Sequence, residues 1–313
     1  MDSEELYQLK SYFYQANYKA VIDHPLPEED SPSYLPSLIY SLRARLALSP
    51  ASPLPQAKDP SLAYRAVAAF SSYLRAADKV EGLDELREVV LEVEGEEELG
   101  WEEGVVRVLS ATAFWREGET EEALDTLSAE GARRDLECVA LTAQIQLSLN
   151  RADLAQKTLE AAKKWADDAL LLQLVEAWVS LRTVRPSVRQ TCTRVLNLSC
   201  QIPPNYNSSY YTFLELTTVP SPSATLLVNR AIAQLCQGNV PEAEGSLAEA
   251  LEKDPSNPEA LVLNARAGSD EALAKIKQVA PDHPMLKALS EAEARFEEAK
   301  TKWEVPPLAT ASA

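Results

Sequence analysis

The sequence predicts an all-α protein in which helix–turn–helix repeats stack into a solenoid. Three observations predict this fold: alanines recur at a spacing close to 34 residues, the apolar residues of each unit follow helical periodicity, and the 313 residues include only 9 glycines. Self-similarity with a fixed period of roughly 20–50 residues is typical of repeat proteins. The repeats therefore define the framework of the chain, and the other segments are departures from it.

The clearest repeat spans residues 224–255, ATLLVNRAIAQLCQGNVPEAEGSLAEALEKDP. Its first helix carries the small Ala231, which lets a second helix approach closely, and Gly238 closes that first helix. The second helix carries Ala243 and ends at Pro255, because proline cannot continue the hydrogen-bond ladder. This pattern is typical of the tetratricopeptide repeat, or TPR.

The same pattern recurs along the chain. Its first-helix alanines follow one another at steps of 32, 34, 54 and 34 residues. Gly118 and Asn150 occupy the turn position that Gly238 holds in the clearest unit. Stacked units of this kind form a superhelix, which we expect to be right-handed. The marker alanines of the array are Ala111, Ala143, Ala177, Ala231 and Ala265.

The step of 54 residues is 20 longer than one 34-residue period, which indicates an insertion between Ala177 and Ala231. The candidate is residues 184–203, which contain no acidic residue, include two cysteines and lack an apolar stripe of helical period. An inserted loop and a retained intron both explain this composition. In either case the TPR-like repeats divide into residues 104–183 and 204–257.

The two ends of the chain depart from the repeat pattern. Residues 1–103 are predicted to form divergent helical pairs with Pro-rich loops, since 8 of the 20 prolines fall between residues 25 and 60. Residues 81–103 contain eleven acidic side chains and one basic one, which fits either a solvated helix face or a docking site for a basic partner. Residues 258–313 are predicted to form a degenerate last repeat and a capping helix at 290–304 that seals the stack.

Composition excludes several classes of function. The formal net charge of −18 repels phosphate backbones and anionic lipid, so we expect no nucleic-acid partner and no direct membrane contact. The most apolar stretch is residues 169–181. A membrane-spanning helix needs about 20 residues, so this stretch is too short to cross a membrane. The acidic N-terminus does not have the pattern of a signal peptide, which predicts a cytoplasmic protein with reduced cysteines.

The sequence offers no catalytic constellation. It contains no phosphate-binding loop, dinucleotide-binding, zinc-protease or nucleophile-elbow motif. Its two histidines, His24 and His283, are interpreted as turn or capping residues, and paired carboxylates of a hydrolase cannot be distinguished from solvated helix faces. We therefore expect no enzymatic activity, no cofactor and no metal site. The cysteines form no CxxC pair and are interpreted as small apolar residues: Cys138, Cys192, Cys200 and Cys236.

A repeat stack offers the inner faces of its first helices as a binding groove. The predicted groove is largely apolar, which favours a lasting protein partner over a clamp for a terminal carboxylate. Trp178 is its best single anchor, because buried aromatic residues dominate interface energetics. Packing between repeats is the alternative role for these side chains. The predicted groove residues are Ala140, Gln144, Leu147, Leu171, Leu174, Trp178, Leu181, Val228, Ile232 and Leu235.

Residues 136–181, LECVALTAQIQLSLNRADLAQKTLEAAKKWADDALLLQLVEAWVSL, resemble the epsilon subunit family of coatomer, the COPI vesicle coat. Residues 229–261, 280–299 and 5–23 are similar to the same family. The likeness is weakest at 25–60 and stops at 184–203. The resemblance implies a structural subunit whose TPR superhelix binds the C-terminal segment of the coatomer alpha subunit.

The same resemblance implies a place in the cell. The coat would be recruited to Golgi membranes by an ARF-type GTPase and would support retrograde Golgi-to-ER and intra-Golgi transport, with membrane contact made through partners. The alternative is a TPR adaptor of another cytosolic complex, similar to membrane-fusion attachment proteins. Such an adaptor is expected to grip acidic helical bundles with a basic surface, and the charge of −18 argues against it.

Overall fold

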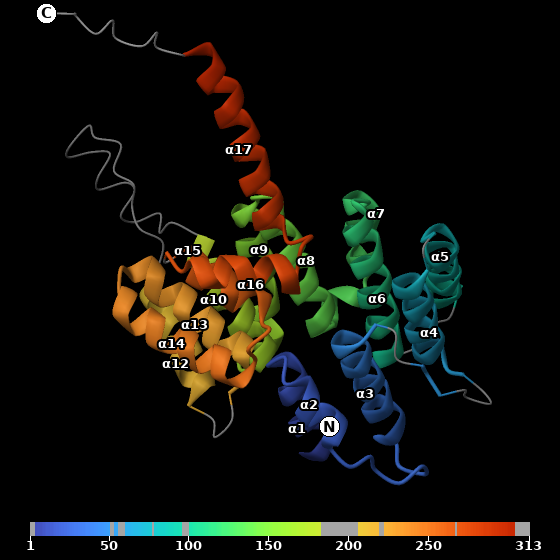
Figure 1. Cartoon of the computed structure of the whole chain (residues 1–313). Helices are drawn as coiled ribbons and strands as arrows, with labels where there is room; N and C mark the ends of the chain where they lie inside the picture. The colour runs from blue at the N-terminus through green and yellow to red at the C-terminus, as the bar shows by residue number, and fades with distance from the viewer. Residues whose placement is uncertain are drawn as a thin grey trace, which may run out of the picture.

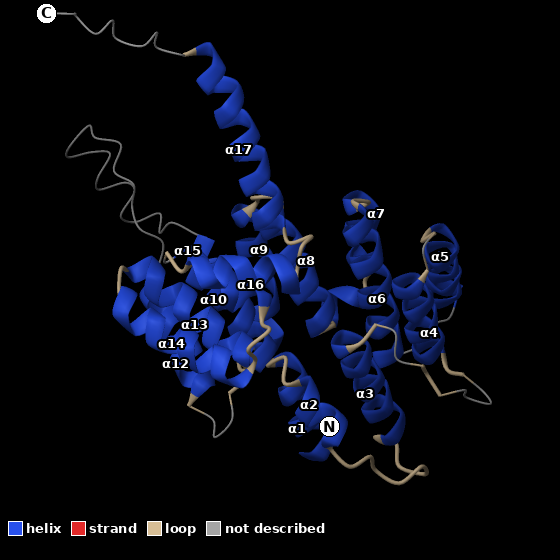
Figure 2. Cartoon of the chain, in the orientation of Figure 1, coloured by secondary structure: helices blue, strands red, loops and turns tan. Residues whose placement is uncertain are grey.

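The computed structural model describes residues 4–50, 53–55, 60–76, 78–95, 100–182, 206–218, 222–266 and 268–303. Within these ranges the secondary structure is helical throughout, with sixteen α-helices, one short 3-10 helix and no strand (Figure 2). The predicted all-α fold class is therefore confirmed. No helix in this described part combines the length and apolarity needed to cross a membrane.

Six helical pairs form the array, and successive pairs pack against one another along the chain (Figure 1). The predicted insertion at residues 184–203 lies outside the described residues, and the division expected after residue 103 falls inside α6. The pairs are α4 (Leu62–Arg75) with α5 (Val80–Gly95), α6 (Trp101–Glu117) with α7 (Thr120–Ser128), α8 (Leu136–Ser148) with α9 (Ala152–Ala166), α10 (Leu170–Arg182) with α12 (Tyr206–Thr217), α13 (Ala224–Gln237) with α14 (Val240–Lys253), and α15 (Pro258–Arg266) with α16 (Asp270–Val279).

Four of the pairs turn through a residue in the left-handed backbone region. Gly118, Gly238 and Gly268 have φ values of +89°, +86° and +103°, and Asn150 has a φ of +60°. Glycine adopts this region without strain, and asparagine tolerates it better than most residues do. The residue after each of them donates its backbone N–H to the carbonyl five residues earlier, which satisfies an otherwise unpaired carbonyl at the helix end.

Four of the five marker alanines are buried where the helices approach one another, and the fifth, Ala265, is partly exposed. Ala111, Ala143, Ala177 and Ala231 are each no more than 1% exposed. A larger side chain at any of them would force neighbouring helices apart, because core packing is already close to crystal density. Small residues at this period are therefore what allows one pair to stack on the next.

The chain begins with α1 (Glu4–Tyr14), α2 (Tyr18–Asp23) and α3 (Tyr34–Leu48), which do not simply extend the array. α3 packs on α4, while α1 also contacts α10 in the middle of the array (Figure 1). The Ser223 hydroxyl, at the N-cap of α13, donates a hydrogen bond to the carbonyl oxygen of Gln15. The N-terminal helices therefore bridge the first and later repeats.

The last helix, α17 (Pro284–Lys302), forms where a capping helix is predicted, and the ring of His283 caps it by accepting a hydrogen bond from the backbone N–H of Met285. It differs from the expected cap because no residue of α17 is buried. Its first turn packs on the α15–α16 core through Met285 and Leu286. The rest of α17 projects from the stack (Figure 1).

Candidate partner-binding site

The ten predicted groove residues lie on α8, α10 and α13, but four of them belong to the core. Ala140, Leu171, Leu174 and Val228 are between 2% and 8% exposed. Neighbouring helices cover these side chains, which leaves almost no surface to offer a partner. These four residues are therefore reassigned from groove contacts to inter-helix packing.

The other six are only partly covered, and five of them fall into two groups. Leu147, Trp178 and Leu181 pack at the edge of one hydrophobic cluster, built mainly by α8, α9 and α10. Ile232 and Leu235 border a separate cluster of α13 and α14. Gln144 on α8 is also partly exposed. We call Leu147, Trp178 and Leu181 the α8–α10 patch.

A buried polar cluster links the N-terminal helices to the repeats. The carboxylate of Glu137, in the first turn of α8, accepts hydrogen bonds from the Tyr40 hydroxyl at 2.5 Å, from Arg43 Nη2 at 2.6 Å and from the Tyr14 hydroxyl at 3.2 Å. Tyr14 belongs to α1, and Tyr40 and Arg43 belong to α3. We call these four residues the N-terminal clasp.

Electrostatics favour the ionised pair at the centre of the clasp. Burial alone would raise the pKa of Glu137, but the charge of Arg43 and the hydrogen bonds from the clasp outweigh burial and hold that pKa below its ordinary value. Asp135 caps α8 by accepting a hydrogen bond from the Cys138 N–H at 2.9 Å. Burial, followed by the charge of Glu137, raises the pKa of Asp135. The pKa values of these two neighbouring carboxyls are therefore shifted in opposite directions.

A cavity of about 490 Å³ lies beside the clasp, between α1 and α3 on one side and α6, α8 and α9 on the other. Tyr14, Tyr40 and Glu137 contribute to its wall, together with Trp101 and Trp165. Sequence reasoning missed both the clasp and the cavity, because Arg43 and Glu137 stand 94 residues apart and belong to no motif. The available signal was the presence of charged side chains within two otherwise apolar helical runs, Arg43 and Arg45 in SLIYSLRARLAL and Glu137 in LECVAL.

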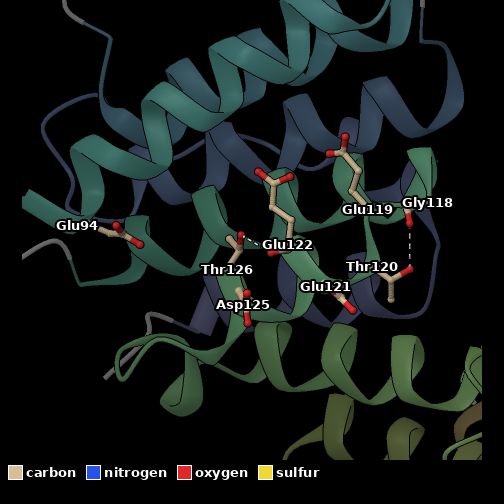
Figure 3. Close-up of a pocket in the computed structure, with 8 residues that line it drawn as sticks. All are labelled: Glu94, Gly118, Glu119, Thr120, Glu121, Glu122, Asp125 and Thr126. Carbon is tan, nitrogen blue, oxygen red and sulfur yellow. Dashed lines mark hydrogen bonds between the residues drawn. The ribbon is translucent and has the colours of Figure 1, made fainter.

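A second hollow, of about 800 Å³, is acidic and lies between α5 and α7. Figure 3 shows the side chains of Glu119 and Glu122 pointing to one side of α7, and those of Glu121 and Asp125 to the other. Arg87 pairs with Glu119 at 2.7 Å and with Glu122 at 2.8 Å, so part of this charge is compensated. Among the described residues no three carboxylate, histidine or cysteine side chains converge as metal ligands would.

Together, the fold and these surfaces define a TPR-like helical-repeat protein. Two solved structures share the fold. A tetratricopeptide repeat protein from Parabacteroides merdae superimposes with a TM-score of 0.53 at 16% identity, over 92% of this chain and 98% of that one. Cut9–Hcn1, a hetero-tetramer of the APC/C, gives a TM-score of 0.52 at 14% identity, over 91% of this chain and 53% of that one.

The chain belongs to the coatomer epsilon subunit family, whose model matches residues 2–304. It is 30% identical over 264 residues to the probable coatomer subunit epsilon of Schizosaccharomyces pombe, covering 83% of this chain and 78% of that protein. It is 25% identical over 306 residues to coatomer subunit epsilon-1 of Arabidopsis thaliana, covering 95% and 96%. The resemblance stated from the sequence is thus confirmed. Coatomer epsilon is a non-catalytic component of the COPI coat.

Proposed function

We propose that this coat subunit binds the C-terminal segment of the coatomer alpha subunit through the partly exposed apolar side chains of its repeats. The observation that carries the proposal is the α8–α10 patch, in a chain whose family match spans nearly its full length. Apolar side chains that a protein leaves partly exposed on a repeat surface gain free energy when a partner covers them. Through the alpha subunit the chain would join the rest of coatomer.

The proposal places the protein in the cytoplasm and, through its partners, on Golgi membranes and COPI-coated vesicles. Recruitment there depends on an ARF-type GTPase, and the function served is retrograde Golgi-to-ER and intra-Golgi transport. Indirect membrane attachment agrees with the net charge of −18, because an acidic protein is repelled by the anionic cytoplasmic leaflet.

Affinity purification of the tagged full chain from native cytosol, followed by mass spectrometry, tests the membership of the complex. We expect stoichiometric recovery of the alpha subunit together with other coatomer subunits. Recovery of a clean monomer would contradict the proposal.

A binding titration with the recombinant alpha C-terminal segment then tests the surface. Trp178→Ala should weaken binding by about 2 kcal/mol or more, as truncation of an interface hot spot does. Tyr211→Ala is the matched control, because Tyr211 is an exposed aromatic residue on α12 outside the patch. Equal affinities for wild type and a folded Trp178→Ala variant would place Trp178 outside the interface.

A further inference from the structure

Helix α17 carries an unbroken apolar stripe along one side. The stripe starts at Met285, ends at Trp303 directly after the helix, and advances by four, three, four, three and four residues. Alternating steps of four and three residues form a heptad pattern, which keeps an apolar seam facing one partner helix in a two-stranded coiled coil. The α17 stripe consists of Met285, Leu289, Ala292, Phe296, Ala299 and Trp303.

The stripe is unpartnered over most of its length. From Glu291 to Trp303 every residue is exposed, and Phe296 and Trp303 expose 67% and 81% of their surface. Figure 1 shows this part of α17 extending away from the α15–α16 pair. The fully exposed part of the helix, Glu291–Lys302, has a length at which an isolated helix is marginal in water, so a partner that buries the stripe would stabilise it.

The charges that flank the stripe are mostly basic, unlike the chain as a whole. On the two flanking positions lie Arg295, Lys300 and Lys302 against the single acid Glu293, whereas the whole chain carries a net charge of −18. These bases pair within the helix with Glu291, Glu297 and Glu298, at 3.8, 3.2 and 2.8 Å, but all members are exposed. Exposed pairs of this kind are worth little, so the bases remain able to pair across a seam.

We infer that α17 docks an acidic amphipathic helix of another protein, side by side along its stripe. The apolar seam supplies the buried area, the two alanines allow close approach, and glutamates or aspartates on the flanks of the partner would pair with Arg295, Lys300 and Lys302. This site is separate from the α8–α10 patch, so it does not depend on the function proposed above.

A second copy of the chain is a poorer occupant. In a parallel pair, Arg295 of one helix would face Lys300 of the other. In an antiparallel pair, the attraction between Glu293 and Lys300 would be offset by repulsion between Arg295 and Lys302. A membrane surface is also a poorer occupant of the stripe. Glutamates lie on the face of α17 opposite the stripe, and the whole chain is acidic.

A titration of the full-length protein with two labelled probe peptides tests the inference by fluorescence anisotropy. Both peptides have three heptads with leucine at the seam positions, and they differ only in carrying glutamate or lysine at every flanking position. We expect the glutamate peptide to bind at least ten times more tightly than the lysine peptide, and its affinity to fall as salt is raised.

Matched variants locate the contact. Phe296→Glu should abolish binding of the glutamate peptide, whereas Thr301→Glu, which adds the same charge opposite the stripe, should retain it. Both positions are exposed, so circular dichroism of each variant should match wild type. Equal binding of the two peptides, or binding of neither, would overturn the inference. So would self-association in sedimentation experiments, or binding to phosphatidylserine vesicles, that is lost in Phe296→Glu.

Discussion

Arg43 on α3 and Glu137 on α8 form a buried ion pair, with 2.6 Å between Nη2 and Oε2, although 94 residues separate them in the chain. The guanidinium also lies over the rings of Phe13 and Tyr40. Its Nη1 atom is buried and finds no hydrogen-bond partner among the described residues. The pair thus fixes the N-terminal helices to the repeats at the cost of one unsatisfied donor.

Removing one partner of this pair should destabilise the protein strongly. Glu137→Gln leaves Arg43 buried without a counter-charge, which typically costs about 3–5 kcal/mol. Urea unfolding of the full chain, followed by circular dichroism, measures the change. The double variant Arg43→Met with Glu137→Met should lose less than either single variant, because no uncompensated charge remains. Strictly additive losses would show that the two side chains do not depend on each other.

The clasp should also make stability depend on pH with a definite sign. The folded state holds the pKa of Glu137 below its ordinary value, so its contribution is complete above the unfolded-state pKa and is lost as pH falls through the folded-state pKa. The stability difference between wild type and Glu137→Gln should therefore shrink on acidification below pH about 4.3. Thermal melts of both proteins between pH 3 and pH 7 measure this difference, and a constant gap would contradict the assignment.

Asp135 should behave in the opposite way. Burial raises its folded-state pKa, so its favourable contribution is present below the unfolded-state pKa and is lost as pH rises through the folded-state pKa. Asp135→Asn keeps an oxygen that can accept the Cys138 N–H but does not titrate. Its stability relative to wild type should therefore increase as pH rises. Thermal melts of Asp135→Asn and wild type between pH 3 and pH 7 measure this difference. If the stability of Asp135→Asn relative to wild type fell as pH rises, the raised pKa of Asp135 would be contradicted.

Ala16 offers a stabilising substitution. It closes α1 with a φ of +57°, a conformation that costs an L-residue roughly 1–2 kcal/mol. Glycine removes this strain but costs about 0.5–1 kcal/mol in chain entropy, so Ala16→Gly should be neutral or should stabilise by up to about 1.5 kcal/mol. The reciprocal control is Gly238→Ala. The added Cβ has no atom within 4 Å, so this variant should be destabilised only by the strain of an L-residue at a φ of +86°. The urea midpoint of Gly238→Ala should fall, whereas that of Ala16→Gly should stay unchanged or rise.

Deleting residues 184–203 tests the predicted insertion. The deletion leaves residues 183, 204 and 205 between α10 and α12, as many as join α8 to α9. The two helices already pack as a pair, and the Ser209 hydroxyl donates a hydrogen bond to the Ala177 carbonyl at 2.9 Å. We expect the melting temperature to stay unchanged or to rise, because a shorter connection costs less loop-closure entropy. A large drop would show that the segment contributes to the fold.

The local rules of the repeat could be predicted from sequence, since they depend on neighbouring residues. Gly118, Asn150 and Gly238 stand at the turns because those turns need a left-handed residue, and the marker alanines stand where helices meet. Which side chains of the predicted groove are buried could not be predicted from these local rules. Leu174 and Trp178 lie one turn apart on α10, yet only the packing of adjacent helices leaves one covered and the other partly open.

Long-range features were beyond a pattern-based prediction for a different reason. No periodicity relates Glu137 to helices formed by residues 4–48, because the pairing arises from how the chain curves back. The pattern of residues 290–304 predicted a helix that seals the last repeat, but α17 contacts that repeat through Met285 and Leu286 and then projects away from it (Figure 1).

The hydrogen bond from Ser223 to Gln15 spans 208 positions, and this separation affects how the protein is made. An ordinary solenoid can fold repeat by repeat as it leaves the ribosome, because each unit needs only its neighbours. Here α1 and α2 emerge first but cannot complete their contacts until α13 has been synthesised. The contacts of the earliest helices are therefore completed only after most of the chain has been made, which adds a long-range contact to an array whose other contacts are mostly between neighbours.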